Sequence, residues 1–579
     1  MKKIHSKFVS KKLMSYAIKE KTNLFIGFLI SFLNTFLLVV GPLIIGYILN
    51  NHIRPNMSSY DLLKIAGLLV IYFLIYLLSG ICVNFSKVYF EITASNVAYA
   101  IRKDVYKHVN NLPISYFDSL PAGSIVARVV SDTNRLKSMF GIFLSEIISN
   151  TIIFVAMFVM IFKTNIFAGS LVIFLLPILL LIFFSTRYLV SKFTIIARSK
   201  NSDLTSKINE NIQNIEIINA FNQEENIFNE YNAVNKELFN ANLKLTWVYS
   251  FDGFVAVENL SFIGIAMILI YFGYGRLGGA YDVSIGSLYI AIEYVTKIFN
   301  SFQSITGRFS EFERSYASAK HVFELLEMEP LKELNENLLN SNGDIEFKDI
   351  HFAYDRDDVL RGVNFKVKNG ESIAFVGSTG SGKSTIINLL LNFYSPRSGS
   401  ITIGNQDIKN INRNKLREDM AVVLQDPFIF EASIRDNITL NDDFNDEQII
   451  KSLKDLGATN IINKGLDTKL IEKGLNLSSG ERQLISFARA YIRNPKILIL
   501  DEATSNIDTD SELIIQKAID TLKENRTTLI VAHRLSTIKN VNQIVVLKNG
   551  VILEKGTHQE LLNLGGFYKE MYEEQIKKD

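Results

Sequence analysis

Long uncharged apolar runs dominate the chain up to about residue 325, whereas the remainder mixes apolar and polar positions as a water-soluble domain does. Thr22–Asn51, Ile65–Ser86 and Thr164–Thr186 contain no charged side chain. Each run is longer than the about 20 residues that an α-helix needs to cross a bilayer. The pattern therefore predicts membrane-spanning helices in the first part of the chain.

Three further spans are less regular. Ile147–Phe162 and Asn259–Gly275 are shorter runs that extend as helices into polar sequence, and Val283–Thr306 is interrupted by Glu293 and Lys297. Counting these, we predict an all-α polytopic membrane domain of six transmembrane helices with long cytoplasmic extensions.

The distribution of Lys and Arg gives the expected orientation. Residues 1–21, 87–146 and 187–258 each hold seven of these residues, whereas the other three connections hold two, one and one. Basic residues concentrate on the cytoplasmic side of membrane proteins. We therefore expect a multi-pass protein of the cytoplasmic membrane with both termini inside. The first span is too long for the apolar region of a cleaved signal peptide.

Composition excludes several other classes. The mean hydropathy of +0.17 over 579 residues excludes a disordered or collagen-like chain. A net charge of +2 argues against a dedicated nucleic-acid binder, which needs a basic surface. The single cysteine, Cys82, excludes an intrachain disulfide framework and a multi-cysteine metal site.

These patterns divide the chain into a transmembrane domain over residues 1–325, a polar linker over 326–343 and a soluble α/β domain over 344–579. The two long cytoplasmic connections in the first domain read as helices. At about 1.5 Å per residue, helical extensions of roughly 25 residues reach nearly 40 Å beyond the membrane, far enough to touch a cytoplasmic domain. A helical cytoplasmic domain unrelated to coupling is the alternative.

The soluble domain contains a predicted phosphate-binding loop. The apolar strand Glu371–Val376 leads directly into a glycine-rich loop, and the helical Thr385–Leu391 follows. Such a loop turns backbone N–H groups toward phosphate oxygens, while its lysine reaches the β- and γ-phosphates and its last serine binds Mg²⁺. The predicted nucleotide-binding residues are Gly377, Ser378, Thr379, Gly380, Ser381, Gly382, Lys383, Ser384 and Thr385.

Two further sequence features fit the same chemistry. The apolar strand Ile497–Leu500 ends in Asp501, a candidate Mg²⁺ ligand, and Glu502, a candidate general base for an attacking water. Ser478, Ser479 and Gly480 stand where a helical run ending near residue 492 begins. The start of a helix is a second anion-binding end.

Together, in this order, these motifs resemble the ATP-binding cassette (ABC) transporter family, and specifically an exporter half-transporter with one membrane domain and one P-loop nucleotide-binding domain with a helical subdomain. The resemblance covers essentially the whole chain and implies ATP and Mg²⁺ as cofactors. It implies that Ser478 and Gly480 face ATP bound to a partner subunit. The other residues that it carries over are Tyr354 on the adenine, Gln425 as Mg²⁺ sensor and relay, Asp508 after the acidic pair, and His533 on the γ-phosphate.

The resemblance also implies a dimer. In this family each ATP lies between the phosphate loop of one subunit and the signature motif of the other subunit, and the signature motif here is Leu477–Gln483. The resemblance assigns coupling to short helices, expected around Tyr116–Ser119 and Phe221–Glu225. The signature departs from the family's Leu-Ser-Gly-Gly-Gln, because Ser479 and Glu481 replace glycine and glutamine. A carboxylate near phosphate is unfavourable unless it points away or pairs with Arg482. We therefore expect a heterodimer in which this chain supplies the competent catalytic residues and a weakened signature, and a homodimer is the alternative.

The sequence leaves the substrate open. The apolar membrane domain fits a lipophilic or amphipathic substrate. A multidrug exporter is therefore favoured over a lipid flippase, and a peptide exporter is third. A membrane-tethered regulatory ATPase that transports nothing is the alternative from another functional class. Glu293 is an intramembrane carboxylate that could attract a cation, but Lys297 follows at i+4, where it could neutralise Glu293.

Overall fold

The computed structural model describes residues 6–53, 59–120, 122–248, 250, 254–278, 284–331, 343–501, 509–532 and 538–576. The chain forms two compact units, one of Met1–Leu112 with Leu120–Glu329 and the other of Pro113–Ser119 with Pro330–Asp579. The division after Glu329 falls within the segment expected to be the linker. The predicted domain boundaries otherwise remain predictions, because residues 332–342 lie outside the described part.

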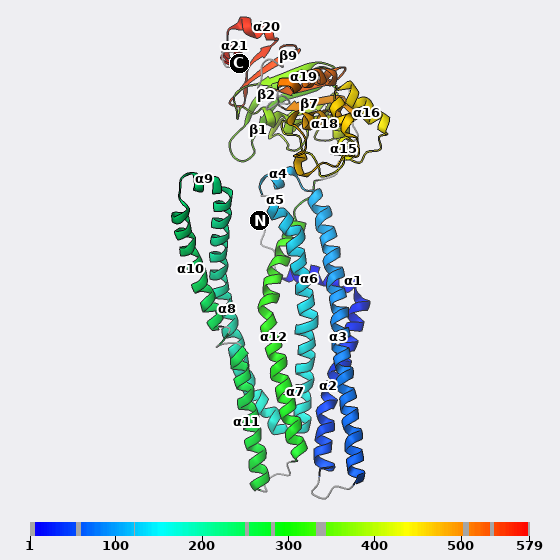
Figure 1. Ribbon diagram of the computed structural model, residues 1–579, viewed down its shortest axis with the longest axis vertical. Helices are drawn as coiled ribbons and strands as arrows, with labels where there is room; N and C mark the ends of the chain where they lie inside the picture. Colours follow the sequence, from blue (N-terminus) through cyan, green and yellow to red (C-terminus); the bar gives the residue numbers. More distant parts are fainter. Residues whose placement is uncertain are drawn as a thin grey trace. The chain divides into compact units, whose positions relative to one another are not determined.

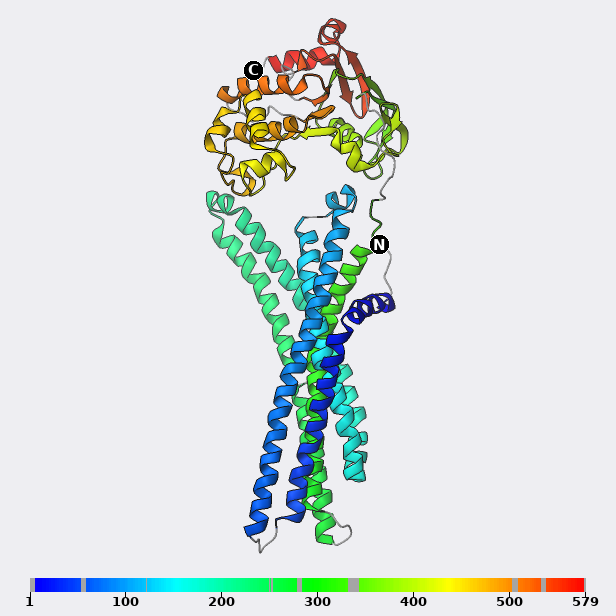
Figure 2. The same ribbon diagram turned by 90° about the vertical axis from the view of Figure 1, so that its right-hand side faces the viewer.

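The described residues of the first unit form helices joined by short turns (Figures 1 and 2). Five of its helical segments are long and apolar enough to cross a membrane, and they correspond to the first five predicted spans. The sixth predicted span lies on helix α12, which carries Glu293 and Lys297. That α12 crosses the membrane stays a prediction. The helices are α1 (Ser6–Lys19), α2 (Lys21–Asn51), α3 (Ser59–Asn110), α5 (Ala122–Ala127), α6 (Thr133–Gly141), α7 (Ser149–Thr164), α8 (Ile166–Gln213), α9 (Ile215–Ala220), α10 (Glu224–Val248), α11 (Phe254–Gly278) and α12 (Ile285–Leu326).

The third span is a continuous helix with two π-helical stretches. Arg128–Asp132 and Ile142–Ile148 link α5, α6 and α7 without a break. It ends at Thr164, where Asn165 adopts an extended backbone and accepts a hydrogen bond from the Ala168 N–H at 3.0 Å. This cap separates α7 from α8, so the uncharged run Thr164–Thr186 belongs to α8 except for Thr164, which ends α7, and the cap residue Asn165.

Tight packing joins α2, α3 and α12. A side chain at Gly41 of α2 would meet the Tyr76 ring of α3 at 2.7 Å, and the Tyr294 hydroxyl of α12 donates to the Val39 carbonyl of α2 at 2.9 Å. Cys82 lies buried on α3 with 6% of its surface exposed. These three helices form a close-packed part of the membrane unit.

The long helix α8 runs side by side with α10, and α9 connects them in a hairpin (Figures 1 and 2). Lys200 of α8 pairs with Glu237 of α10 at 2.6 Å, and Lys207 pairs with Glu230. Phe221, at the turn before α10, is 71% exposed. The expected coupling segment Phe221–Glu225 thus lies at the tip of this hairpin.

The second unit is built on a six-stranded sheet in the order β10-β9-β3-β8-β7-β6, with a four-stranded antiparallel sheet in the order β2-β1-β4-β5. Strands β9, β3, β8, β7 and β6 are parallel neighbours, and β10 is antiparallel to β9. The strands are β1 (Ile345–Phe352), β2 (Leu360–Val367), β3 (Ser372–Val376), β4 (Ser398–Ile403), β5 (Gln406–Asp407), β6 (Met420–Val423), β7 (Ile497–Asp501), β8 (Thr527–Val531), β9 (Gln543–Lys548) and β10 (Val551–Gly556).

The parallel strands are buried on both faces, which explains their unbroken apolar sequences. Helices between β6 and β7 form the predicted helical subdomain. The helices of this unit are α4 (Ile114–Asp118), α13 (Lys383–Leu390), α14 (Arg413–Glu418), α15 (Ile434–Thr439), α16 (Asp446–Asp455), α17 (Thr459–Lys464), α18 (Ser479–Ile492), α19 (Thr509–Lys523), α20 (His558–Leu564) and α21 (Phe567–Ile576).

Candidate nucleotide-binding site

The predicted phosphate loop joins the buried strand β3 to the start of α13. Its first glycine has no room for a side chain, since a Cβ on Gly377 would lie 2.1 Å from the Leu547 carbonyl oxygen of β9. Gly382, immediately before α13, has φ of +105°, a region that favours glycine. Both glycines therefore set the curvature that turns the loop around an anion at the helix N-terminus.

The interior of the loop is polar. Lys383 is 5% exposed, and its ammonium donates to the Gly377 and Ser378 carbonyl oxygens at 2.7 and 3.1 Å. The buried Ser381 hydroxyl has no hydrogen-bond partner among the described residues. A buried hydroxyl without a partner is costly. A phosphate oxygen in the loop would satisfy it, so these residues fit the triphosphate of ATP.

Tyr354 lies beside the same loop. Its hydroxyl accepts a hydrogen bond from the Asn388 amide of α13 at 3.1 Å, and the Thr385 hydroxyl is 3.4 Å away. Its ring packs edge-on against Phe352 and Tyr394, with centroids 4.8 and 4.9 Å apart. The side chain is nevertheless 48% exposed, which leaves ring surface for an adenine.

The acidic pair starts where β7 ends. Asp501 is the last residue of this strand and is aligned with Val531, the last residue of β8, while β8 pairs with β3. The carboxyl ends of these parallel strands share one edge of the sheet, which is where the phosphate loop begins. Glu502, Asp508 and His533 lie outside the described residues, so their predicted positions stay predictions.

Gln425 and the start of the signature helix line one cavity of about 480 Å³. Gln425 contributes from the loop after β6, and Ser479, Arg482 and Gln483 contribute from α18. The Gln483 amide reaches the Leu424 carbonyl at 3.5 Å. The structure thus brings together two predicted motifs that stand more than 50 residues apart in sequence.

Arg489 is a positioning residue that the sequence did not identify. Its guanidinium donates to the Phe428 carbonyl at 3.0 Å and to the Asn437 carbonyl at 2.7 Å. Burial, helped by the neighbouring Arg493, lowers the pKa of Arg489 to about 10. Arg489 therefore ties the loop that follows Gln425 to α18, which begins in the signature. Nothing in the linear sequence distinguishes this arginine from its neighbours.

The altered residues of the signature take part in a helix cap and an ion pair. Ser478 caps α18, with its hydroxyl accepting from the Glu481 N–H at 3.2 Å, while the Glu481 carboxylate accepts from the Ser478 N–H at 2.9 Å. Lys464 pairs with Glu481 at 2.7 Å. Arg482, one of the two ways considered above to relieve Glu481, does not pair with it among the described residues and donates instead to the Leu477 carbonyl at 2.8 Å.

The electrostatic consequence of this cap is a stabilised carboxylate. Burial alone would raise the pKa of Glu481, but the hydrogen bonds from Lys464 and from the Ser478 N–H outweigh it and hold that pKa below its usual range. Glu481 is thus charged at neutral pH and already committed to two donors. Lys464, which sequence reasoning missed, lies 17 residues earlier on a different helix.

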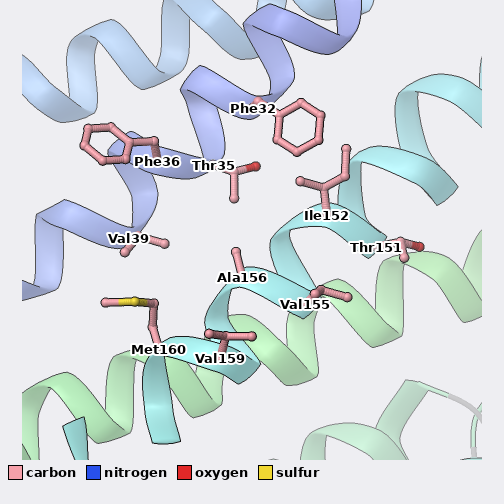
Figure 3. A pocket seen from close by; sticks show the side chains of 10 residues that line it. All are labelled: Phe32, Thr35, Phe36, Val39, Thr151, Ile152, Val155, Ala156, Val159 and Met160. Carbon is pink, nitrogen blue, oxygen red and sulfur yellow. The ribbon is translucent and has the colours of Figure 1, made fainter. Parts of the chain in front are cut away.

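The membrane unit contains an apolar groove of about 610 Å³ between α2 and α7 (Figure 3). Phe32, Phe36 and Val39 border it from α2, and Val155 and Met160 border it from α7. Its two threonines add no free hydroxyl, because each donates to a carbonyl of the preceding helical turn. The groove therefore suits an apolar group.

Glu293 and Lys297 do not form an ion pair within 4.0 Å in the described part of α12. The Lys297 ammonium lies instead 5.7 Å from the centre of the Tyr76 ring on α3. The expected neutralisation of Glu293 by direct contact with Lys297 is therefore absent.

Comparison with known proteins places both parts of the chain in one family. Residues 24–302 match the ABC transporter transmembrane region, and residues 360–505 match the ABC transporter nucleotide-binding family, described as "ABC transporter". A Bacillus subtilis protein described as "Probable multidrug resistance ABC transporter ATP-binding/permease protein" is 40% identical over 83% of this chain and 73% of its own length.

Two other comparisons extend over nearly the whole chain. An ATP-dependent lipid A-core flippase of Syntrophus aciditrophicus is 31% identical over 90% of this chain and 87% of its own. The structure of a bacterial Atm1-family ABC exporter with ATP bound has a TM-score of 0.79, covering 97% of this chain and 98% of that one at 23% identity. The last comparison confirms the fold.

Proposed function

This chain belongs to the ABC transporter family, and on that premise we propose that it exports lipophilic or amphipathic compounds of the multidrug type across the cytoplasmic membrane. The family couples ATP hydrolysis to transport, and the chain is a multi-pass membrane protein. The observation that carries the proposal is the phosphate loop, in which Lys383 is buried and the Ser381 hydroxyl is left without a partner. Basic residues around the described helices support a cytoplasmic position for both termini and for the nucleotide-binding unit.

The predicted site residues have different roles in binding and hydrolysing ATP. The phosphate loop binds the triphosphate, with Lys383 toward the β- and γ-phosphates, and Tyr354 stacks on the adenine. Ser384, Gln425 and Asp501 would hold Mg²⁺, which would neutralise phosphate charge when bound. Glu502 accepts a proton from the attacking water, and His533 contacts the γ-phosphate. Asp508, six residues after Glu502 in the sequence, belongs to the predicted nucleotide-binding set.

We propose that the working unit is a dimer, because the chain carries one phosphate loop and one signature. Ser478, Ser479 and Gly480 would face the nucleotide held by the other subunit. Ser479 adds a side chain where the family has glycine, which limits the approach of the backbone to phosphate. This supports a heterodimer in which the partner's nucleotide site is completed by an altered signature.

The apolar groove between α2 and α7 supports a lipophilic substrate, since its surface offers almost no polar partner. A lipid flippase is the second candidate, favoured by the likeness to a lipid A-core flippase over most of the chain. A peptide exporter is the third candidate, and it has no comparable observation in its favour. A homodimer is the alternative assembly for both of these candidates.

The test measures Mg²⁺-dependent ATP hydrolysis and substrate uptake by the full-length protein in lipid nanodiscs and inverted vesicles. Glu502→Gln is the matched inactive control, and the oligomeric mass is read from the same sample. Stimulation by lipophilic compounds together with their uptake supports export, whereas stimulation by lipid with leaflet exchange supports the flippase. A homodimer with full activity that Glu502→Gln abolishes contradicts the heterodimer, and hydrolysis without any transport contradicts the export proposal.

A further inference from the structure

A small basic cavity lies between α8 and α12 in the first unit. Its volume is about 160 Å³, and its charged lining residues are Arg187, Arg198, Glu313 and Arg314. Three arginines against one glutamate give the cavity a net charge of about +2. The lining also includes the hydroxyl groups of Ser191 and Thr194, so the cavity is rich in hydrogen-bond donors.

The sequence places these donors on one face. Arg187, Ser191, Thr194 and Arg198 are spaced by four, three and four residues, which aligns them along one side of α8. Helical side chains slant toward the N-terminal end of their helix. The side chains of Arg198 and Arg314 therefore slant back toward the apolar parts of α8 and α12.

Only one of the three arginines is neutralised. Arg187 forms an ion pair with Glu313, and its guanidinium lies 5.1 Å from the centre of the Phe309 ring. Neither Arg198 nor Arg314 has an ion pair within 4.0 Å in the part of the chain that the structure describes. Two guanidinium groups thus remain available to an anion.

An aromatic cluster lies next to Arg187, one of the lining residues of the cavity. The Phe183 ring packs against Phe309 and Phe302, with centroids 5.3 and 6.3 Å apart, and Phe309 packs against Phe312 at 6.1 Å. Arg187 directly follows the uncharged segment that ends at Thr186. The cavity therefore lies where the uncharged part of α8 ends, and Arg187 connects it to the aromatic cluster through Phe309.

From this arrangement we infer that the cavity between α8 and α12 binds the phosphate headgroup of an anionic membrane lipid from the cytoplasmic leaflet. A volume of about 160 Å³ equals roughly five water molecules, enough for one phosphate group but not for a large headgroup. Arginine forks bind phosphate oxygens in pairs, and basic pockets between membrane helices on the cytoplasmic side recognise anionic lipids. The acyl chains would lie along Phe183 and Phe309. The inference rests on the orientation proposed above and not on the transported substrate.

The test removes the two unpaired charges from the full-length protein, purified with its partner subunit if it requires one. The variant is Arg198→Gln/Arg314→Gln. The matched control is Lys192→Gln/Arg308→Gln, which removes the same charge from the same two helices at residues outside the cavity lining. Binding of dioctanoyl phosphatidylglycerol is measured by native mass spectrometry, with dioctanoyl phosphatidylcholine and inorganic phosphate as the other probes.

We expect the dissociation constant for phosphatidylglycerol to rise at least about tenfold in the cavity variant, a loss of about 1.4 kcal/mol, and to stay near wild type in the control. Binding of phosphatidylcholine should not respond. Equal affinity of the two variants for phosphatidylglycerol overturns the inference. Equal binding of inorganic phosphate and phosphatidylglycerol overturns it as well, since the site would then recognise a soluble anion. Unchanged melting temperature of the lipid-free variant shows that it is folded.

The result of the lipid-binding test does not depend on whether the export proposal holds. Glu502→Gln should bind phosphatidylglycerol as the wild type does, because the measurement needs no ATP. Loss of lipid binding in the cavity variant with normal hydrolysis therefore bears on this site alone.

Discussion

The ammonium of Lys464, at the end of α17, holds the carboxylate of Glu481 in the first turn of α18 at 2.7 Å. Glu481 stands where the family has glutamine, and the same carboxylate accepts the Ser478 N–H at 2.9 Å. A negative charge at a helix N-terminus is stabilising. The substitution thus strengthens the local fold of this helix while it places negative charge beside a surface expected to meet phosphate.

Glu481→Ala should destabilise the nucleotide-binding unit by about 1 kcal/mol, because it removes the acceptor of the Ser478 N–H, which is half of the capping box, and the partner of Lys464. Glu481→Gln keeps an acceptor for the Ser478 N–H and should cost less, while it restores the family residue and increases ATP hydrolysis by the assembled dimer. The measurements are melting temperature and ATPase rate of the full-length protein. Equal melting temperatures for Glu481→Ala and wild type would contradict the role of the cap.

Gly377→Ala should abolish nucleotide binding, because its Cβ would lie 2.1 Å from the Leu547 carbonyl oxygen and neither backbone can yield without distorting the loop. Gly370→Ala is the matched control, since Gly370 also has positive φ but would place a Cβ in open space. The control should lose only about 1 kcal/mol of stability to backbone strain. Binding of a fluorescent ATP analogue distinguishes the two variants. Normal affinity of Gly377→Ala for the analogue would contradict the steric role of Gly377.

Tyr394→Phe should leave ATP binding unchanged but reduce the stimulation of ATP hydrolysis by a transported compound several-fold. The Tyr394 hydroxyl donates to the Asp118 carboxylate of the short helix α4, while its ring packs against Tyr354 at 4.9 Å. Burial, followed by the hydrogen bond to Asp118, raises the pKa of Tyr394, so the phenol remains a donor. Phenylalanine keeps the ring contact and removes only the donor.

Asp118→Asn provides the complementary test of this contact. It keeps an acceptor for the Tyr394 hydroxyl and should be milder than Tyr394→Phe in the same ATPase measurement. If both variants respond to substrate as the wild type does, α4 does not act through Tyr394.

Acidification should destabilise the C-terminal part of the nucleotide-binding unit. The His558 ring nitrogen Nδ1 lies 2.7 Å from the buried Tyr568 hydroxyl, and burial, with the nearby Lys539, lowers the pKa of His558 below its ordinary 6.5. The unfolded chain therefore takes up a proton at a higher pH than the folded one. Stability is complete above about pH 6.5 and falls as the pH drops through the folded pKa.

The measurement is the melting temperature of the full-length protein between pH 7.5 and 5.5, compared with His558→Gln. The variant should show a weaker dependence on pH over this range. An equally steep dependence in both proteins would assign the effect to other groups.

Sequence patterns predicted the elements that local chemistry determines. The strand before Gly377, the helix after Lys383 and the capped start of α18 all follow from apolar runs, glycines and a serine at short spacing. The partners of these residues could not be predicted, because they come from distant segments. Lys464 reaches Glu481 from another helix, and Leu547 restricts Gly377 across a parallel strand pair that joins residues far apart in sequence.

The membrane domain shows the same limit. Hydropathy located five of the six predicted spans, but it could not show that the Lys297 ammonium lies near the Tyr76 ring of α3. Helical spacing alone allowed a pair between Glu293 and Lys297, and no such pair within 4.0 Å occurs in the part of the chain that the structure describes. The cavity lined by Arg187, Arg198 and Arg314 likewise requires knowing that α8 and α12 are neighbours.

The burial of Cys82 on α3 makes the protein well suited to spectroscopic labelling. This is the chain's one cysteine, and only 6% of its surface is accessible to a thiol reagent. A single cysteine introduced at the exposed Phe221 would therefore carry a spin label or fluorophore with little background, and no native residue would have to be replaced first. Distances from this label to a second label on the other subunit could then follow the hairpin of α8 and α10 through the ATP cycle in the natural background of this chain.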